Sequence, residues 1–403
     1  MIGVLEKFKA LAVDDAPGQE GRQAAVDLSS IRRGDPLPGR PVDFSHGDVD
    51  AHPPLPEAQA AFAAGLAAGG SQAYTEYRGA LSIRDEVADH LADFTGASVD
   101  AVDGLLLTPG TQGALFLAIA ATVGSGDKVA IVQPDYFANR KLTAFFGGQM
   151  SPVPLEYLPD GPDAGLDLGA LRAAFENGAK VFLFSNPNNP TGVVYSASEI
   201  ASIARLATEF GVTVIADQLY SRLQYSGQTF THLRSAGMPA EQIVTIMGPS
   251  KTESLSGYRL GVAFGASDII ARMEQLQAIV SLRAAGYNQA VLRTWFNEPD
   301  GWMAARVTAH EAIRDDLLRV FRGAGFATRI PQAGSYLFPT LPDLAVDLRS
   351  FVRFLREQAG VVVTPGTEFG PHPNSIRLNY SQDHLAAVAA AQRIVQMVDR
   401  YRA

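Results

Sequence analysis

Residues 248–261 read Gly248-Pro249-Ser250-Lys251-Thr252-Glu253-Ser254-Leu255-Ser256-Gly257-Tyr258-Arg259-Leu260-Gly261. This segment follows one apolar run, residues 243–247, and leads into another, residues 260–264. A lysine at the end of a strand is placed to reach a cleft, where its amine can attack a carbonyl group. An arginine eight residues later can neutralise an anion such as a phosphate. Taken alone, the segment could equally be a surface loop with two cations.

Length and composition limit the class of protein. A chain of 403 residues predicts two or three domains, and 47% hydrophobic with 19% charged residues is typical of a globular protein. The net charge of −9, with no basic run, argues against a nucleic-acid partner. Cysteine is absent, so disulfides, thiolate metal sites and cysteine nucleophiles are excluded, and we expect no metal site.

The sequence also carries no targeting signal that we recognise. The first 19 residues lack an apolar core followed by a cleavage site. The longest apolar run, around residues 114–123, is roughly half the length of a membrane span. We therefore expect a cytoplasmic protein without a membrane partner.

Apolar runs alternate with helical patterns through the middle of the chain, which is typical of a mostly parallel sheet covered by helices on both faces. The predicted strands are residues 105–107, 128–132, 181–184, 212–216, 243–247 and 261–264. The predicted helices between them are residues 113–123, 168–175, 197–210 and 268–276.

The two ends of the chain predict a second, smaller α+β domain. A long helical pattern runs from about residue 289 to 321, and then come a strand at 334–339, a helix at 348–359, a strand at 375–380 and a final helix at 385–401. We expect an N-terminal arm and small-domain segment over 1–56, a large domain over 57–290 and a C-terminal small domain over 291–403.

Polar side chains follow several predicted strands, where open α/β sheets bind ligands. Gly110-Thr111-Gln112 opens a helix, so its free N–H groups and the helix dipole can hold a phosphate. Tyr136 follows the next strand and either stacks on a planar ligand or packs in the core.

Three further residues stand at such positions. Asn189 lies in a segment with two Asn-Pro pairs, which could simply form a rigid turn. Asp217 ends an apolar strand, with Tyr220 three residues later, and a carboxylate there should meet a cation or a hydrogen-bond donor. Arg377 lies inside an apolar strand, where a structural salt bridge is the alternative to ligand binding.

Together these features resemble the aspartate aminotransferase superfamily, the class I/II aminotransferases of fold-type I that use pyridoxal 5'-phosphate. The most specific parts are Asn189-Pro190-Thr191-Gly192, Asp217 with Tyr220, and Ser250-Lys251 with Gly257-x-Arg259-x-Gly261. The resemblance covers nearly the whole chain. It implies a ping-pong aminotransferase that moves an amino group from an L-amino acid to a 2-oxo acid through a lysine aldimine.

The resemblance also implies roles for single residues. Lys251 would carry the aldimine and later move the proton, while Asp217 would pair with the pyridine nitrogen. Asn189 and Tyr220 would bind the phenolic oxygen, and Tyr136 would stack on the ring.

Other implied roles concern the phosphate, the substrate and a second subunit. Arg259 would hold the phosphate together with Gly110, Thr111 and Gln112. Tyr74 would reach the phosphate in the neighbouring subunit, so the active unit would be a homodimer. Arg377 would bind the substrate α-carboxylate, with Asn189 beside it and the backbone of Gly47 closing over it.

The chain departs from the family pattern at several positions. Gly248 stands where relatives often have a serine that binds phosphate, so Ser250 or Thr111 would compensate. Glu253, close to Lys251, should point away from the phosphate or pair with a cation. A substrate role stays open for His46 and His52.

Substrate and reaction type are not fixed by these residues. If glutamate or aspartate is a substrate, Arg283 or His46 is the candidate contact for its distal carboxylate. The alternatives within the fold are a lyase, a racemase, a decarboxylase or an oxidase. A regulator that joins this fold to a DNA-binding module is disfavoured, because no basic helix-turn-helix segment precedes residue 40.

Overall fold

An eight-stranded sheet forms the centre of the computed structural model, which describes residues 3–11, 27–160 and 164–403. Its strand order is β2-β9-β8-β7-β6-β3-β4-β5. The strands are β2 (Leu105–Pro109), β3 (Lys128–Gln133), β4 (Gln149–Glu156), β5 (Gly165–Leu166), β6 (Ala179–Ser185), β7 (Thr213–Asp217), β8 (Ile243–Met247) and β9 (Leu260–Gly265). The run from β8 to β4 is parallel, whereas β9 is antiparallel to both of its neighbours and β5 to β4. The prediction of a mostly parallel sheet is confirmed.

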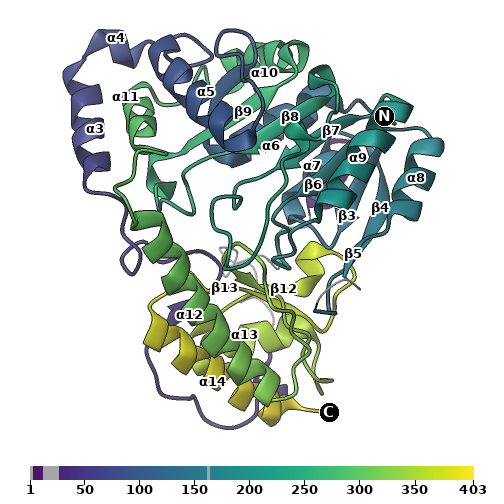
Figure 1. Ribbon diagram of the computed structural model, residues 1–403. Helices are drawn as coiled ribbons and strands as arrows, with labels where there is room; N and C mark the ends of the chain where they lie inside the picture. The colour runs from purple at the N-terminus through teal and green to yellow at the C-terminus, as the bar shows by residue number, and fades with distance from the viewer. Residues whose placement is uncertain (1–2, 12–26, 161–163) are drawn as a thin grey trace.

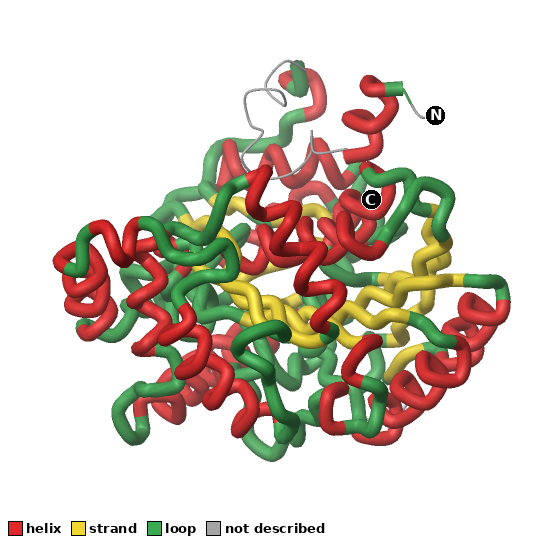
Figure 2. Tube along the Cα trace, turned by 90° about the horizontal axis from the view of Figure 1, so that it is seen from above, coloured by secondary structure: helices red, strands yellow, loops and turns green. Residues whose placement is uncertain are grey.

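Helices cover both faces of this sheet (Figure 2). Along β3, Val129 and Ile131 face a core cluster that includes residues of α6 (Gly110–Thr122) and α10 (Ser267–Val280). Ala130 and Val132 face the opposite cluster, which includes residues of α8 (Leu168–Glu176) and α9 (Ala197–Phe210). Because successive side chains of a strand point to opposite faces, burial on both faces requires the continuous apolar runs seen in the sequence.

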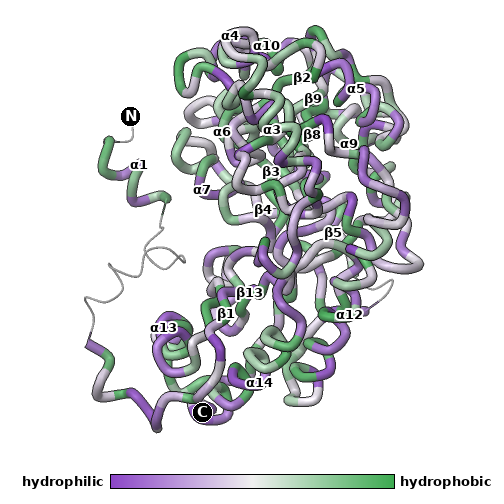
Figure 3. Tube along the Cα trace, turned by 90° about the vertical axis from the view of Figure 1, so that its left-hand side faces the viewer, coloured by the Kyte–Doolittle hydropathy of each residue, from purple (hydrophilic) through white to green (hydrophobic). Residues whose placement is uncertain are grey.

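A third group of helices closes the β2 end of the sheet. It comprises α3 (Glu57–Ala67), α4 (Gly70–Ala73), α5 (Leu81–Thr95), α11 (Gly286–Gln289) and the 3-10 helix η5 (Ala290–Thr294). Residues of α5 pack with Leu105, Leu107 and Val262 in one core cluster. Next to β3 and β4, α1 (Val4–Leu11) lies beside α7 (Phe137–Phe145), with the rings of Phe8 and Phe145 5.9 Å apart (Figure 3).

A smaller unit lies below the large sheet in Figure 1. It contains the antiparallel sheet β10 (Tyr336–Leu337), β13 (Ile376–Asn379) and β12 (Thr364–Pro365), with helices α12 (Trp302–Gly323), α13 (Leu348–Ala359) and α14 (His384–Tyr401). The N-terminal segment joins it, because β1 (Val42–Asp43) pairs with β11 (Val361–Val362) and Phe44 is fully buried in its core. The domain boundaries at residues 56 and 290 stay predictions.

Helix α13 was predicted with its observed bounds, since every local signal agrees there. Leu348, Phe351, Phe354 and Leu355 recur at helical spacing and are buried. The carboxylate of Asp347 accepts a hydrogen bond from the backbone N–H of Ser350 at the N-terminus. Gly360, at φ +63°, ends the helix in the left-handed conformation.

Other boundaries were predicted wrongly. The helical pattern from residue 289 to 321 is interrupted, and α12 begins only at Trp302, after Pro299 and a left-handed Gly301. The strand expected at 334–339 shortens to β10. Strand β4 was missed because Pro152 and Pro154 disguise it, which is tolerated near the edge of a sheet.

The two units are joined by buried contacts. Lys141 of α7 forms a buried ion pair of 2.6 Å with Glu368 of the 3-10 helix η6 (Gly366–Phe369). Phe338 and Phe369 of the smaller unit pack within a core cluster of the large sheet. These contacts hold β10 and β13 against the sheet edge. Within the described residues, no helix combines the length and apolar character that crossing a membrane requires.

Candidate active site

A cavity of about 220 Å³ opens at the carboxyl ends of the parallel strands, next to the smaller unit. Most of the site residues predicted from the sequence line it, and these are Thr111, Gln112, Tyr136, Asn189, Asp217, Tyr220, Ser250, Lys251, Arg259 and Arg377. Strand register explains why these residues meet in one cavity, because Ser185 at the end of β6 pairs with Asp217 at the end of β7. Residues that follow neighbouring parallel strands therefore meet at one sheet edge.

The N-terminus of α6 and Arg259 form one end of the cavity. Gly110 adopts φ +77°, and a Cβ there would lie 2.6 Å from the Arg259 guanidinium. A Cβ at Gly261 would lie 2.4 Å from the backbone N of Thr111. These glycines let the loop, the helix start and the arginine approach closely, which suits an anion such as a phosphate.

The same close packing accounts for Gly248. A Cβ at this position would lie 3.0 Å from Cγ2 of Thr111 and 3.2 Å from the carbonyl oxygen of Leu260. Ser250 and Thr111, which both line the cavity, supply hydroxyl groups near this end. In this structure the Ser250 hydroxyl donates to the Leu260 carbonyl at 3.3 Å.

Asp217 is enclosed by the protein and faces the cavity. Burial raises its pKa to about 6, although the Leu219 backbone N–H donates to its carboxylate at 3.1 Å. No basic side chain of the described residues forms an ion pair with it. The expected cation partner is therefore not supplied by the described part of the chain, and a bound ligand with a protonated nitrogen would provide one.

Arg377 is buried without a carboxylate partner among the described residues. It donates to the side chains of Asn189 and Thr364 and to the carbonyl of Ser45, each at 3.2 Å. Its guanidinium lies between the rings of Tyr336 and Phe369, 4.4 and 5.0 Å from their centroids. Its Nε has no hydrogen-bond partner. The structural salt bridge is thus not observed, and the group is available to an anionic ligand.

Lys251 borders two adjoining cavities. The second, of about 190 Å³, is also lined by His46, Gly47, Asp48 and several serines. Gly47 therefore lies next to Lys251 without touching the main cavity. His46 is close to Asp43, at 3.4 Å, and His52 instead stacks on His310 at 4.4 Å, outside both cavities.

Glu253 is buried and paired with a cation, as expected. It forms an ion pair with Arg222, which also binds Glu298 through two hydrogen bonds of 2.8 Å. Burial raises the pKa of Glu253 to about 7 despite the nearby arginine. Glu253 does not line the main cavity.

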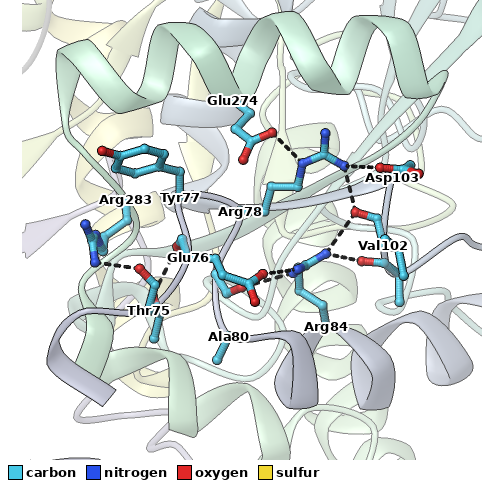
Figure 4. Close-up of polar contacts among 12 residues, drawn as sticks. Thr75, Glu76, Tyr77, Arg78, Ala80, Arg84, Val102, Asp103, Glu274 and Arg283 are labelled. Carbon is cyan, nitrogen blue, oxygen red and sulfur yellow. Dashed lines mark hydrogen bonds and ion pairs between the residues drawn. The ribbon is translucent and has the colours of Figure 1, made fainter. Parts of the chain in front are cut away.

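Tyr74 and Arg283 line neither of the two cavities beside Lys251. The Tyr74 side chain is 82% exposed, and the Arg283 guanidinium lies 5.8 Å from the centre of its ring. Figure 4 shows how arginines fix this loop: Arg283 donates to the Thr75 carbonyl and Arg78 binds Glu274 at 2.6 Å. The loop is held firmly while its tyrosine points to solvent.

Sequence reasoning missed several residues of the cavity. The cavity is also lined by Ser45, Ser185, Ser256 and Tyr336, none of which was predicted to be a site residue. Asp135 lies behind it, where burial raises its pKa to about 7 while the Ser185 hydroxyl and backbone N–H donate to its carboxylate. The hydroxyl of Tyr220 donates to that of Tyr336 at 2.6 Å. Because a buried tyrosine in a strand is typical of an ordinary core, no feature of the sequence distinguishes Tyr336.

Comparison with known proteins decides the family. The model of the family "Aminotransferase class I and II" matches residues 41–394. The chain belongs to this family. It is 66% identical to an aspartate aminotransferase of Rhodobacter sphaeroides 2.4.1, whose crystal structure it matches with a TM-score of 0.94 over 100% of both chains.

More distant relatives point to the same chemistry. The probable N-succinyldiaminopimelate aminotransferase DapC of Mycobacterium tuberculosis is 29% identical over 81% of this chain and 82% of its own length. The aspartate/prephenate aminotransferase of Thermus thermophilus is 27% identical over 98% of this chain and 97% of its own. This protein is an aminotransferase, which answers the question that Lys251, Asp217 and Arg377 left open.

Asp217→Asn should stabilise the ligand-free protein at pH 8. The raised pKa means that ionising Asp217 costs more in the folded than in the unfolded state, so its contribution to stability falls as pH rises from about 4 to 6. Removing the charge should raise the free energy of unfolding by about 1–3 kcal/mol at pH 8 and change it little at pH 4. Urea denaturation at both pH values measures this.

Asp127→Asn is the matched control. Lys180 and the Gly124 backbone lower the pKa of this surface carboxylate, so the substitution should slightly destabilise the protein at pH 8. A loss of stability for Asp217→Asn at pH 8 would show that its carboxylate is not an uncompensated buried charge.

Proposed function

We propose that this aminotransferase uses pyridoxal 5'-phosphate in the 220 Å³ cavity and moves an amino group from an L-amino acid to a 2-oxo acid by a ping-pong mechanism. The observation that carries the proposal is the uncompensated Asp217 carboxylate in the same cavity as Lys251. A cofactor with a basic ring nitrogen and an aldehyde would complement both groups.

The residues present fit this cofactor. The phosphate would be held by Arg259, Ser250 and the start of α6, which comprises Gly110, Thr111 and Gln112. Asp217 would bind the pyridine nitrogen, and Tyr136, whose hydroxyl donates to Gln112 at 2.8 Å, would lie against the ring. Asn189 and Tyr220 would bind the phenolic oxygen. Lys251 would hold the aldehyde carbon through its Nζ.

When bound, the cofactor supplies an electron-withdrawing ring that stabilises negative charge on the substrate Cα. Asp217 supports this by keeping the ring nitrogen protonated. The Nζ of Lys251 accepts the Cα proton of the amino acid. Arg377 binds the α-carboxylate through two parallel hydrogen bonds, with Asn189 and the backbone of Gly47 beside it.

We also infer that two chains form the active unit, each contributing Tyr74 to the phosphate of its neighbour. Tyr74 is exposed on a loop that arginines hold in place, and it lies outside its own cavity. Several apolar residues close in sequence to Tyr74 or Arg283 are also exposed, and these are Tyr77, Ile279, Val280 and Leu282. Such a patch suits a subunit interface. Arg283, beside Tyr74, would then contact the distal carboxylate of an acidic substrate in the neighbouring site. The lack of cysteine fits a cytoplasmic enzyme.

Borohydride reduction should attach the cofactor to Lys251. Reduction converts the bond between the lysine nitrogen and the aldehyde carbon to a stable one, so peptide mapping should find the adduct at this residue. Lys251→Ala should lose turnover by several orders of magnitude, because both the nucleophile and the proton acceptor are removed. An adduct on another lysine would refute the assignment.

Mixing inactive variants should restore activity if the sites are shared. In a mixed dimer of Lys251→Ala with a severe Tyr74 variant, both substitutions affect the same site. The other site of that dimer is intact. Random exchange should recover about 25% of wild-type activity, since half of the dimers are mixed and each has one good site. In the same way, mixing Lys251→Ala with Arg283→Ala and assaying with an acidic donor tests whether Arg283 acts in the neighbouring site.

The control mixes Lys251→Ala with Asp217→Asn. Both residues line one chain's cavity, so every site of a mixed dimer stays defective. Equal recovery in both mixtures, or full activity in a monomer, would contradict the shared site.

A further inference from the structure

Tyr336 borders the cavity and links two of its parts. It lies on β10, its side chain is buried, and it lines the cavity with Lys251 and Arg377. The Tyr220 hydroxyl donates to its hydroxyl at 2.6 Å, and the two rings are 5.1 Å apart at 69°. One face of the same ring lies 4.4 Å from the guanidinium carbon of Arg377.

The backbone around Tyr336 is held firmly. Tyr336 pairs with Asn379 across β10 and β13, the strand that carries Arg377. The carbonyl of the left-handed Gly334 accepts hydrogen bonds from the hydroxyls of Tyr225 and Tyr380. The position of the Tyr336 ring is therefore set by the smaller unit, whereas Tyr220 belongs to the large one.

The hydroxyl of Tyr220 has only one proton to donate. In this structure the proton goes to Tyr336. A phenolic oxygen of the cofactor, bound as proposed above, would require that proton. Tyr336 can then rotate its own O–H to donate to the Tyr220 oxygen, whereas a phenylalanine at 336 could not.

We propose that Tyr336 is a positioning residue for amino transfer: its hydroxyl holds Tyr220 against the cofactor, and its ring holds Arg377 against the substrate carboxylate. This inference rests on the proposed use of pyridoxal 5'-phosphate. Tyr336 would thus link the cofactor side of the site, through Tyr220, to the substrate side, through Arg377.

The charges around Tyr336 favour this direction of donation. Burial raises the pKa of its phenol, but Arg377 and Lys251, together with hydrogen bonds from Tyr220 and Asn379, outweigh burial and lower it. The contribution of Tyr220 is lost when the donation is reversed, whereas the two cations remain. Burial raises the pKa of Tyr220 and of nearby Tyr136. The more acidic phenol is the stronger donor, so Tyr336 strengthens the hydrogen bond that Tyr220 makes in turn.

Two substitutions separate the hydroxyl from the ring. With Tyr336→Phe, the pH midpoint of the bound cofactor's absorption band should rise by about half a unit, because the phenolate of the cofactor loses support from Tyr220. The same variant should lower kcat about 5- to 10-fold and leave KM for the donor within twofold. Tyr336→Leu should also raise that KM about 10-fold, since Arg377 loses one ring.

Tyr401→Phe is the matched control. It removes the hydroxyl of another buried tyrosine, which donates to Gln358 at 2.8 Å and does not line the cavity. It should lower stability while the absorption midpoint stays unchanged. If Tyr336→Phe leaves the midpoint and kcat as they are in the wild type, the proposal is overturned.

Failure of the proposed function gives a different result. In that case the wild-type protein itself shows no cofactor band, or its borohydride adduct maps away from Lys251. A wild-type band fixed at Lys251, with an unresponsive Tyr336→Phe variant, overturns only the role of Tyr336.

Discussion

Asp217 and Arg377 carry opposite charges in one enclosed cavity but form no ion pair with each other or with any other described residue. Burying each charge without a charged partner costs free energy, which raises the pKa of Asp217 to about 6. The two groups stay apart because different elements hold them: Asp217 ends β7, and Arg377 lies on β13 of the smaller unit. Both charges thus remain available to ligands.

The rest of the structure maintains this separation. Aromatic rings and neutral hydrogen-bond acceptors hold Arg377, so its guanidinium is fixed without being neutralised. The Lys141–Glu368 ion pair and the insertion of Phe338 and Phe369 keep the smaller unit against the sheet edge. Close approaches at Gly110 and Gly261 bring Arg259 to the start of α6. Gly248 belongs to the same packing, which explains why a larger residue does not stand there.

The sequence predicted the parts of the site that follow strand ends. Lys251, Asp217 and Asn189 all follow apolar runs within a few residues, and parallel strands bring such positions to one edge. Tyr336 was not predictable, because both residues of β10 are buried and burial alone does not tell which side chain borders a cavity. Pro152 and Pro154 hid β4 for a local reason, and the break before α12 was hidden by apolar residues that continue the helical period through Trp295. Tyr74 shows the limit of a single chain, since the role that we propose for it requires a second subunit.

A single-turnover reaction tests the central claim most directly, namely that Lys251, Asp217 and Arg377 form one amino-transfer site. The cofactor-loaded enzyme is mixed with an L-amino acid in the absence of any 2-oxo acid. We expect one equivalent of the corresponding oxo acid per site, after which the reaction stops until a 2-oxo acid is added. Continuous product release without an acceptor, or loss of the carboxylate as carbon dioxide, would contradict this assignment.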